Sequence, residues 1–274
     1  YNQSKRIKMR LKINSQMREC KSKSLFALKA ELGVSDDAIT LYRGFAITSD
    51  CELDENDSVI FMDKNQIPKG ELLREIMYSR NTPELNEALK NACVGVAGLG
   101  GLGSSVAIAL ARVGVGRMIL CDFDTVDASN LNRQQYFLKD LGIKKTTALK
   151  ENIALINPFV SVETKDLWLD ESNVNETFAP CDIVAECFDN AKSKAMIISS
   201  LSKPLIAASG IAGYGRSEEI KITQFASNVW ICGDLKDAAS IGNGLMAPRV
   251  GVAAMMQANF ILEFIAKNGT KNEK

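Results

Sequence analysis

A glycine-rich turn between an apolar segment and a helix-forming segment constrains the fold most strongly. Residues 93–97 form an apolar run without polar alternation, as in a strand that is buried on both faces. The run leads into a turn whose glycines are Gly98, Gly100, Gly101 and Gly103. The spacing G-x-G-x-x-G between a strand and a helix brings backbone N–H groups and a helix N-terminus to a phosphate. The turn therefore predicts a nucleotide site, but it does not choose between NAD and ATP.

Apolar runs and helical stretches alternate along the chain from residue 91 onward. Further buried strands are expected at residues 118–121, 183–185 and 205–208, and helices at 103–113, 145–156 and 191–201. Residues 219–225 alternate as an antiparallel edge strand does, and residues 250–266 predict a long apolar helix. This βαβ rhythm predicts an α/β fold, with a Rossmann-like and mostly parallel sheet that has helices on both faces.

The segments that precede this region predict a different kind of unit. Residues 1–66 combine short strands at 7–13, 39–42, 45–47 and 58–62 with one helix at 24–32, which indicates a small α+β domain. Residues 67–90 contain two helical patterns, the second starting at Pro83, and are interpreted as a helical connector. The third segment, 91–274, is the predicted ATP-binding domain. A length of 274 residues is compatible with two modest domains.

Charge balance and the absence of histidine exclude several classes of function. The 33 basic and 33 acidic side chains cancel, which argues against a protein that binds nucleic acid or a membrane surface. No apolar run approaches the length of a membrane span, and no secretory signal is visible. A chain without histidine cannot use a Ser-His-Asp or Cys-His mechanism of its own. The seven cysteines form no C-x-x-C pair, which predicts reduced thiols and a cytoplasmic location.

Polar residues are concentrated after the second predicted strand. Asp122 lies about twenty residues beyond the glycines, where an acidic side chain bonds a ribose hydroxyl, and its alternative role is to cap a turn. The stretch that begins at Asp124 and ends at Gln135 offers cations and amides suited to a triphosphate, whereas a nicotinamide needs an apolar face. Any single residue there could equally belong to a solvated loop, so the prediction rests on the combination.

A multi-part motif resembles one family. Residues 122–134 read D-F-D-x-V-x-x-S-N-L-N-R-Q and residues 142–145 read G-x-x-K, which is similar to the signature of the ThiF/MoeB family of carrier-protein adenylyltransferases, relatives of ubiquitin-activating enzymes. The similarity extends over residues 78–266, with C-F-D-N at 187–190 and G-L-M-A-P at 244–248. The resemblance implies a Rossmann-like fold, a homodimer, ATP with Mg²⁺, and adenylation of the C-terminal glycine of a carrier protein.

The resemblance also implies roles for individual residues. The phosphates would be contacted by Asn130, Arg133 and Lys145, with Gln134 nearby, and Mg²⁺ by Asp189. Asp189 could also cap the helix that follows it. Residues 77–81 resemble the family's R-Y-S-R-Q, whose last arginine reaches the partner subunit's site. Arg80 is therefore the candidate trans-acting arginine, and an ordinary surface arginine is its alternative.

Two departures from the family limit these expectations. Many members bind a structural zinc through two C-x-x-C pairs, whereas residues 229–232 keep one cysteine of the first pair and no second pair follows, so no zinc is expected. Ser240 lies near the place of a cysteine often found before G-x-M-A-P, which leaves covalent sulfur transfer open, with Cys187 and Cys232 as remaining thiols. Burial is the preferred explanation for Cys187.

The N-terminal unit resembles a ThiS-like, ubiquitin-fold (β-grasp) domain. It lacks a free Gly-Gly end, so it is expected to be a docking or dimer-stabilising module and not the substrate. The leading prediction is adenylation of a ThiS-like sulfur-carrier protein for thiamine thiazole synthesis. Its alternatives are activation of a molybdopterin-synthase carrier or a tRNA-bound carboxylate, and a non-catalytic ubiquitin-like scaffold. An NAD oxidoreductase is a more distant alternative. The sequence does not identify the carrier or the sulfur donor.

Overall fold

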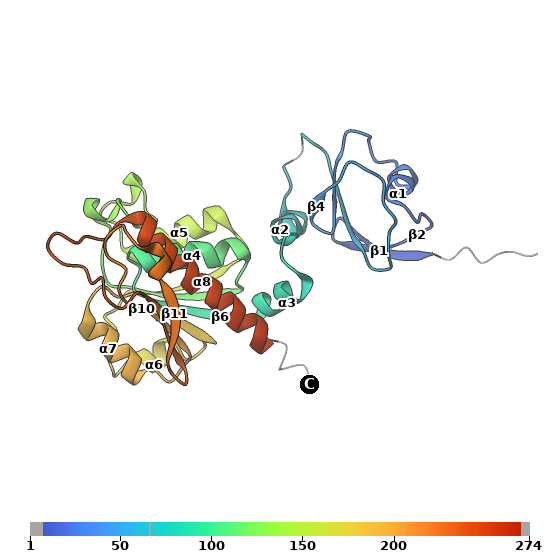
Figure 1. The fold of residues 1–274 in the computed structure, drawn as a ribbon. Coiled ribbons are helices and arrows are strands. Elements are labelled where there is room, and N and C mark those ends of the chain that lie inside the picture. The colour runs from blue at the N-terminus through green and yellow to red at the C-terminus, as the bar shows by residue number, and fades with distance from the viewer. Residues whose placement is uncertain (1–7, 66, 270–274) are drawn as a thin grey trace, which may run out of the picture. The chain divides into compact units, whose positions relative to one another are not determined.

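The computed structural model describes residues 8–65 and 67–269. The chain divides into two compact units, Tyr1–Thr82 and Pro83–Lys274, and each is described by itself (Figure 1). Of the two helices in the expected connector, α2 (Gly70–Tyr78) lies in the first unit and α3 (Pro83–Asn91) in the second. The bounds 1–66, 67–90 and 91–274 remain predictions.

The second unit is built on a seven-stranded sheet with the order β11-β12-β10-β9-β6-β7-β8. Its strands are β6 (Cys93–Ala97), β7 (Arg117–Cys121), β8 (Ser161–Lys165), β9 (Ile183–Glu186), β10 (Leu205–Ala208), β11 (Lys221–Ala226) and β12 (Val229–Gly233). All neighbours pair in parallel except β11 and β12, which pair antiparallel at one edge. This confirms the predicted α/β fold class. From β6 the chain adds β7 and β8 on one side, and it then crosses over to add β9 and β10 on the other side. A crevice is therefore expected at the carboxyl end of β6, where the strand order reverses.

Successive strand residues point to opposite faces of the sheet, and here both faces are apolar. Helices therefore cover both faces. The helices that follow α3 are α4 (Gly101–Val113), α5 (Lys145–Ile156), α6 (Val174–Thr177), α7 (Ala191–Ser200) and α8 (Ala247–Gly269). Val94 and Val96 pack into the core formed with α4, α5 and α8. Cys93 and Ala97 pack on the opposite face, with Phe178 and with Ile197 of α7. Short 3-10 turns lie at Ala128–Asn130, Leu138–Asp140 and Ser217–Glu219.

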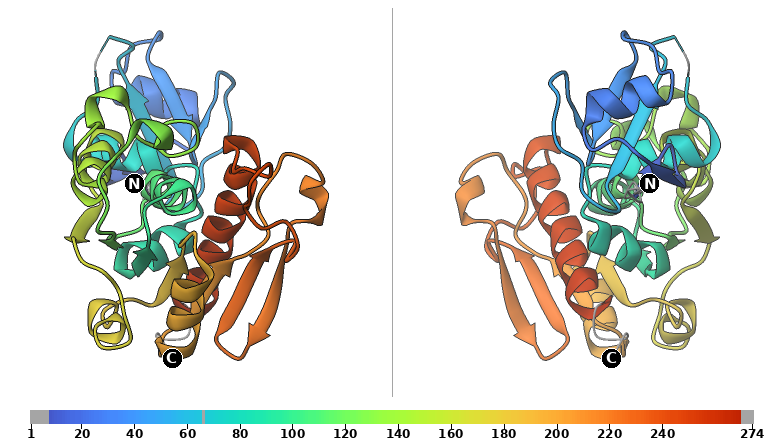
Figure 2. Two further views of the ribbon diagram at one scale, coloured as in Figure 1. Left: turned by 90° about the vertical axis from the view of Figure 1, so that its left-hand side faces the viewer. Right: turned by 90° about the vertical axis from the view of Figure 1, so that its right-hand side faces the viewer.

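Helix α8 is the longest apolar element of the described residues. By length and composition alone it could cross a membrane, but a core helix passes the same test. Its residues Val250, Ala254, Ala258, Ile261 and Ile265 are buried in the main core, and it packs along α4. Figure 2 shows α8 beside the β11–β12 pair. The predicted helix at 250–266 is thus confirmed, three residues longer at each end, as a core helix of this unit.

The first unit is a five-stranded sheet with the order β2-β1-β5-β3-β4. Its elements are β1 (Met9–Ile13), β2 (Gln16–Cys20), α1 (Leu25–Glu31), β3 (Ile39–Tyr42), β4 (Phe45–Ala46) and β5 (Ser58–Met62). Strands β1 and β5 pair in parallel and the other neighbours antiparallel, which confirms the expected β-grasp arrangement. Ser24 caps α1, and Leu25 and Leu28 pack on Val59 and Phe61.

Helix α2 covers the other face of this small sheet. Lys12 pairs in register with Ser58, and both point away from the face that α1 covers. The carboxylate of Glu75 on α2 lies 3.1 Å from Lys12 Nζ and accepts a hydrogen bond of 3.2 Å from Ser58 Oγ. Ile60, which shares that face, is only 2% exposed. The chain that leaves β5 therefore folds back onto its own domain.

Candidate nucleotide-binding site

A pocket of about 290 Å³ lies at the carboxyl ends of the central strands of the second unit. It collects most of the residues that the sequence singled out. Those that line it are Gly98, Gly100, Gly101, Asp122, Asp124, Arg133, Gln134, Lys145 and Asp189. The lining does not include Gly103, Asn130 or Arg80. The crevice expected from the sheet topology is therefore present in the described residues as a pocket with charged, polar and apolar side chains in its lining.

The glycine turn is held against the neighbouring strand. Gly98 has a φ of +89°, which favours glycine, and its N–H donates to the carbonyl of Cys121 at 2.9 Å. The Leu99 N–H donates to Asp122 Oδ2 at 2.6 Å. A Cβ on Gly103 would lie 1.8 Å from the Gly98 carbonyl oxygen, so Gly103 allows α4 to approach the turn. The role of Gly103 is thus close backbone packing behind the pocket.

Two carboxylates and a lysine lie beyond this turn. Asp122 is 9% exposed, and its second oxygen accepts a bond of 2.8 Å from the Asp124 N–H. Lys145 begins α5, its side chain is 7% exposed, and its Nζ lies 2.8 Å from Asp124 Oδ2. The ammonium group therefore faces the pocket from an almost buried position, where its interaction with an anion is little screened.

The polar stretch after Asp124 presents an arginine and an amide. Asn130 completes the capping box of its own 3-10 turn, because its Oδ1 accepts from the N–H of the N-cap residue Asp127 at 3.1 Å. Its carbonyl accepts from the N–H groups of Arg133 and Gln134 at 3.1 and 2.9 Å. Gln134 is 8% exposed, and its Oε1 is buried with no hydrogen-bond partner among residues 8–65 and 67–269. Asn130 therefore supports the residues that reach the pocket.

The next two residues anchor this stretch to the glycine turn and to α4. The Tyr136 hydroxyl donates to the Leu99 carbonyl at 2.8 Å, and burial raises the pKa of Tyr136, so the phenol stays protonated. The Gln135 N–H donates to Ser104 Oγ at 3.0 Å. These bonds fix the arginine and the amide relative to the glycines.

Asp189 follows β9 and faces the pocket from the opposite side. Asn190, and not Asp189, caps α7, because Asn190 Oδ1 accepts from the Ser193 N–H at 2.8 Å. The carboxylate of Asp189 therefore remains exposed at the pocket. Hard cations such as Mg²⁺ prefer carboxylate oxygens together with the oxygens of a bound phosphate. An unpartnered buried amide oxygen, three cationic side chains and an open carboxylate fit a magnesium–nucleotide pair.

Sequence reasoning missed a buried ion pair beneath Asp189. Glu186 at the end of β9 is fully buried, and its two oxygens lie 2.9 and 3.0 Å from Lys194 Nζ. Burial raises the pKa of Glu186, while Lys194 opposes this effect. The carboxylate also accepts from the Phe188 N–H at 2.6 Å and so shapes the chain before Asp189. A charged residue at the end of an apolar strand could have indicated this pair.

Two aromatic side chains at the pocket were also missed. Phe123 and Trp168 both line it and are 45% and 56% exposed. Their ring centroids lie 4.7 Å apart with an interplanar angle of 51°. Leu167 and Leu169 line the pocket beside them. This apolar part suits a planar ring, and the cations opposite suit phosphates.

Arg80 and the cysteines have other surroundings. Arg80 belongs to the first unit, where its guanidinium lies 4.7 Å from the centroid of the Phe45 ring. Cys187 lines the pocket but is 6% exposed, and burial raises the pKa of its thiol well above the usual value, which confirms that it is buried. Cys232 is fully buried, and burial raises its pKa to about 12. Residues 8–65 and 67–269 contain no cluster of three or more potential metal ligands.

The sheet, the glycine turn and the pocket define a Rossmann-type nucleotide-binding protein. A family model described as the ThiF family matches residues 72–274, and one described as ThiS-like ubiquitin matches residues 9–65. The chain therefore belongs to the ThiF family and carries an N-terminal ThiS-like domain, as its motifs had indicated.

Curated relatives extend this assignment. The chain is 32% identical over 195 residues to a molybdopterin-synthase adenylyltransferase of Haemophilus influenzae, a match that covers 68% of this chain and 79% of the relative. It is 31% identical over 194 residues to the adenylyltransferase and sulfurtransferase MOCS3 of Caenorhabditis briggsae, covering 66% of this chain and 48% of the relative. The chain thus spans about half the length of the latter protein.

A solved structure with the same fold is the E. coli tRNA N6-threonylcarbamoyladenosine dehydratase TcdA in complex with ATP. The TM-score is 0.67 at 20% identity, and the match covers 75% of this chain and 99% of that chain. At this identity the likeness shows the fold alone.

Proposed function

We propose that the chain uses ATP to adenylate the C-terminal carboxylate of a ThiS-like sulfur-carrier protein. The observation that carries the proposal is the convergence of Arg133, Gln134, Lys145 and Asp189 on one pocket beside the glycine turn. Cationic side chains suit a triphosphate better than a nicotinamide. The names of the relatives, which are adenylyltransferases, support the same reaction.

The reaction needs no general base from this chain. A carboxyl terminus is already ionised at neutral pH and can attack the α-phosphorus of ATP directly. The bond from the α-phosphorus to the bridging oxygen breaks, and pyrophosphate leaves with the electron pair. Arg133 and Lys145 stabilise the negative charge of the phosphates, and the wall around them orients the carboxylate. When bound, Mg²⁺ would be held by Asp189 and would neutralise phosphate charge.

The thiamine carrier is the preferred substrate. The ThiS-like domain at residues 9–65 supports it, because a fusion brings together partners of one pathway. The name of the Haemophilus relative favours a molybdopterin-synthase carrier as the second candidate. A tRNA-bound carboxylate is a third candidate, and the zero net charge of the chain argues against it. A non-catalytic scaffold has no use for the arrangement of Arg133, Lys145 and Asp189.

Exchange of radiolabelled pyrophosphate into ATP tests these candidates. The full chain is mixed with Mg²⁺, ATP and one purified carrier at a time, either a ThiS-type or a molybdopterin-synthase carrier. We expect exchange with the ThiS-type carrier and at least about tenfold less with the other, a selectivity equivalent to 1.4 kcal/mol. The reverse preference would reassign the substrate. Absence of exchange with both carriers and with tRNA, despite ATP binding, would favour the scaffold.

The fused domain is proposed to dock the carrier or to stabilise a homodimer in the cytoplasm. Its own end cannot be the substrate, because β5 leads into a segment that ends in α2 and not into a free tail. The test compares the full chain with a chain that lacks residues 1–78, so that α2 is removed with its sheet and Arg80 is kept. Sedimentation should show a weaker dimer, or exchange should show a higher KM for the carrier. Unchanged dimerisation together with an unchanged KM would count against both roles.

A further inference from the structure

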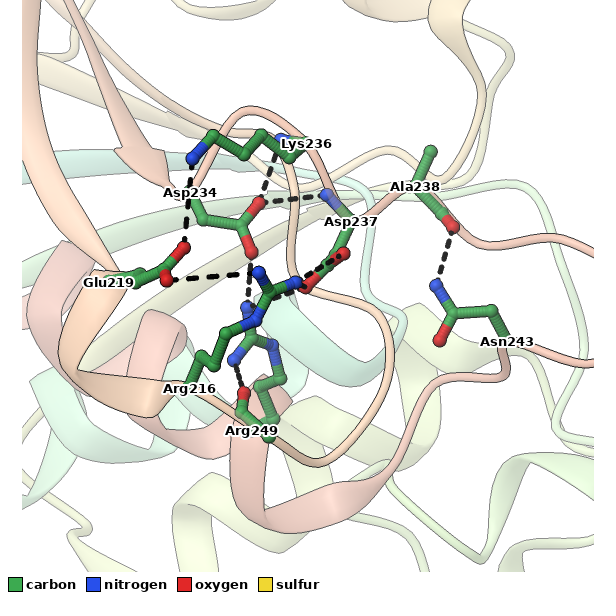
Figure 3. A network of polar contacts seen from close by, with 9 residues as sticks. Arg216, Glu219, Asp234, Lys236, Asp237, Ala238, Asn243 and Arg249 are labelled. Carbon is green, nitrogen blue, oxygen red and sulfur yellow. Dashed lines mark hydrogen bonds and ion pairs between the residues drawn. The ribbon is translucent and has the colours of Figure 1, made fainter.

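A buried ion pair joins the start of α8 to the loop that follows β12 (Figure 3). The side chains of Arg249 and Asp234 are each 1% exposed. An Arg249 Nη donates to Asp234 Oδ2 and lies 3.4 Å from Asp237 Oδ2, and the other Nη donates to the Gly215 carbonyl. One arginine side chain thus holds together the loop at Gly215 and the loop that follows β12. We call Arg249 and Asp234 the clasp.

Asp234 also shapes its own loop. Its Oδ1 accepts hydrogen bonds from the N–H groups of Lys236 and Asp237 at 2.8 and 2.9 Å. A Cβ on Gly210 would lie 2.1 Å from that oxygen, so the opposite loop leaves just enough room for the carboxylate. Arg216 covers the cluster from the outside, with a nitrogen 3.1 Å from Asp237 Oδ2. The loop after β12 is therefore folded around a carboxylate that the arginine neutralises.

This loop forms part of the wall of the nucleotide pocket. Asp237, Ala238 and Ala239 line the pocket from this side, and Ser209 to Ala212 line it from the adjacent loop. The two loops are tied together, because the Ala212 N–H donates to the Asp237 carbonyl at 2.9 Å. The clasp lies behind this wall, and neither Arg249 nor Asp234 lines the pocket.

Physical chemistry indicates what such a pair contributes. Removing two charges from water costs about as much as their attraction returns, so a buried ion pair adds little net stability over apolar groups of similar size. The pair does, however, raise the free energy of every loop conformation in which the two charges are separated. We propose that Arg249 and Asp234 are positioning residues that hold residues 237–239 as a rigid wall of the ATP site. The inference rests on the proposed adenylation reaction.

The test separates positioning from stability with two variants and a control. Arg249→Met leaves Asp234 buried and unpaired. The double variant Asp234→Asn with Arg249→Met removes both charges and keeps an oxygen for the N–H groups of Lys236 and Asp237. Arg117→Met is the matched control, because Arg117 pairs with Glu163 on the surface at the other end of the sheet. Each full-length variant is examined for its thermal midpoint, for the rate of tryptic cleavage after Lys236, and for the KM for ATP in carrier-dependent exchange.

Arg249→Met should lower the midpoint, since an unpaired charge is left in the interior. In the double variant the midpoint should return close to that of the wild type. Cleavage after Lys236 should nevertheless remain about tenfold faster than in the wild type, because the loop opens locally. The KM for ATP should stay raised by at least about fivefold while kcat changes less, as expected when a binding wall is lost. The control should show none of these changes.

A double variant that recovers the midpoint, the cleavage rate and the KM together would overturn the inference, since the pair would then act through stability alone. An Arg249→Met variant with wild-type cleavage and KM would overturn it as well. If the wild type shows no exchange, the proposed reaction fails. The cleavage rates, measured with and without ATP, still decide whether the clasp holds the loop.

Discussion

Lys144 and Lys145 are neighbours in the sequence but have different surroundings in the structure. The side chain of Lys144 is 44% exposed, and its Nζ lies 3.1 Å from Asp166. That of Lys145 is 7% exposed and faces the pocket beside Asp124. If removing Lys145 reduces activity more than removing Lys144, the loss is therefore due to the position of Lys145 in the pocket and not to the loss of one positive charge.

We expect Lys145→Met to lower kcat for pyrophosphate exchange roughly 10²–10³-fold, the usual cost of losing one preorganised donor to a developing charge. The KM for the carrier should change little, because Lys145 would act on the phosphates. Lys144→Met is the matched control and should keep the wild-type rate within about threefold, as surface changes usually do. Equal losses in both variants, measured by initial exchange rates, would argue against a phosphate contact by Lys145.

A buried carboxylate in the first unit has a stability consequence that depends on pH. Asp57 is 7% exposed and is bonded by Arg43 Nε at 2.6 Å and by the Tyr42 hydroxyl at 2.7 Å. Burial opposes its ionisation, but hydrogen bonds from Arg43, the Asp54 N–H and Tyr42 outweigh burial and lower the pKa of Asp57. A lowered pKa stabilises the folded unit above the pKa of the unfolded chain, and this stabilisation is lost as the pH falls.

Asp57→Asn should therefore destabilise the first unit by about 1–3 kcal/mol at neutral pH, the cost of losing charge-assisted hydrogen bonds. The difference from the wild type should shrink as the pH is lowered below about 4, where the unfolded aspartate becomes protonated. Urea unfolding followed by circular dichroism at several pH values measures this difference in the free energy of unfolding. Asp36→Asn, at an exposed position, is the control. A difference that stays constant down to pH of about 2 would contradict the linkage.

At the scale of elements, the strands whose bounds were predicted correctly are strands with buried apolar residues. The strands β3, β5, β6 and β10 have the predicted bounds, because their apolar residues face cores on one or both sides. The sequence analysis missed β2 and β8, which lie at sheet edges and carry mostly exposed or half-buried side chains. It also missed β12, although this strand lies inside the sheet and is largely buried. Edge strands need no apolar pattern, since their outer surfaces meet water. Their formation depends on a neighbouring strand that no local pattern reveals.

The same reasoning applies to the site. The glycine turn, Arg133 and Lys145 could be located because a motif fixes their order along the chain. The motif did not reveal that Asn130 completes the capping box of a 3-10 turn. It also did not reveal Glu186 and Lys194, which meet from the end of β9 and from α7. A polar residue near a pocket can contact the ligand or support a neighbour that does. Only the three-dimensional arrangement separates these two roles.

The close packing of helix α4 against the glycine turn can be tested at Gly103. Gly103→Ala would place a methyl group 1.8 Å from the Gly98 carbonyl oxygen, so the helix and the turn must separate. We expect a loss of roughly 1–3 kcal/mol in the free energy of unfolding, typical of overpacking, together with weaker ATP binding by calorimetry. Gly251→Ala in α8 is the control, because nothing lies within 4 Å of its Cβ position. It should be neutral or stabilise by about 0.5–1 kcal/mol. Similar stability and affinity in both variants would refute the packing role.

For the whole molecule, the candidate trans-acting arginine and the nucleotide pocket belong to different units of the chain. The pocket is lined by residues of the second unit alone, between Gly98 and Val250. Arg80 lies near the end of the first unit and stacks on Phe45, which is itself 61% exposed. The sequence motif predicts that this arginine acts in the site of a partner subunit. Mixing two inactive variants tests that prediction directly.

Arg80→Ala and Lys145→Met should each abolish most of the exchange activity when assayed alone. If Arg80 acts across a homodimer, a mixed dimer contains one site with both residues intact. Subunit exchange at a one-to-one ratio should then restore about a quarter of the wild-type activity per subunit, because half of the dimers are mixed and each has one working site. If Arg80 acts within its own chain, neither site of a mixed dimer is intact and the mixture stays inactive.

Mixing Lys145→Met with Arg133→Met is the control, since both residues line the same pocket and no mixture can restore it. An Arg80→Ala variant with wild-type activity would remove this arginine from the reaction and leave the stacking on Phe45 as its role.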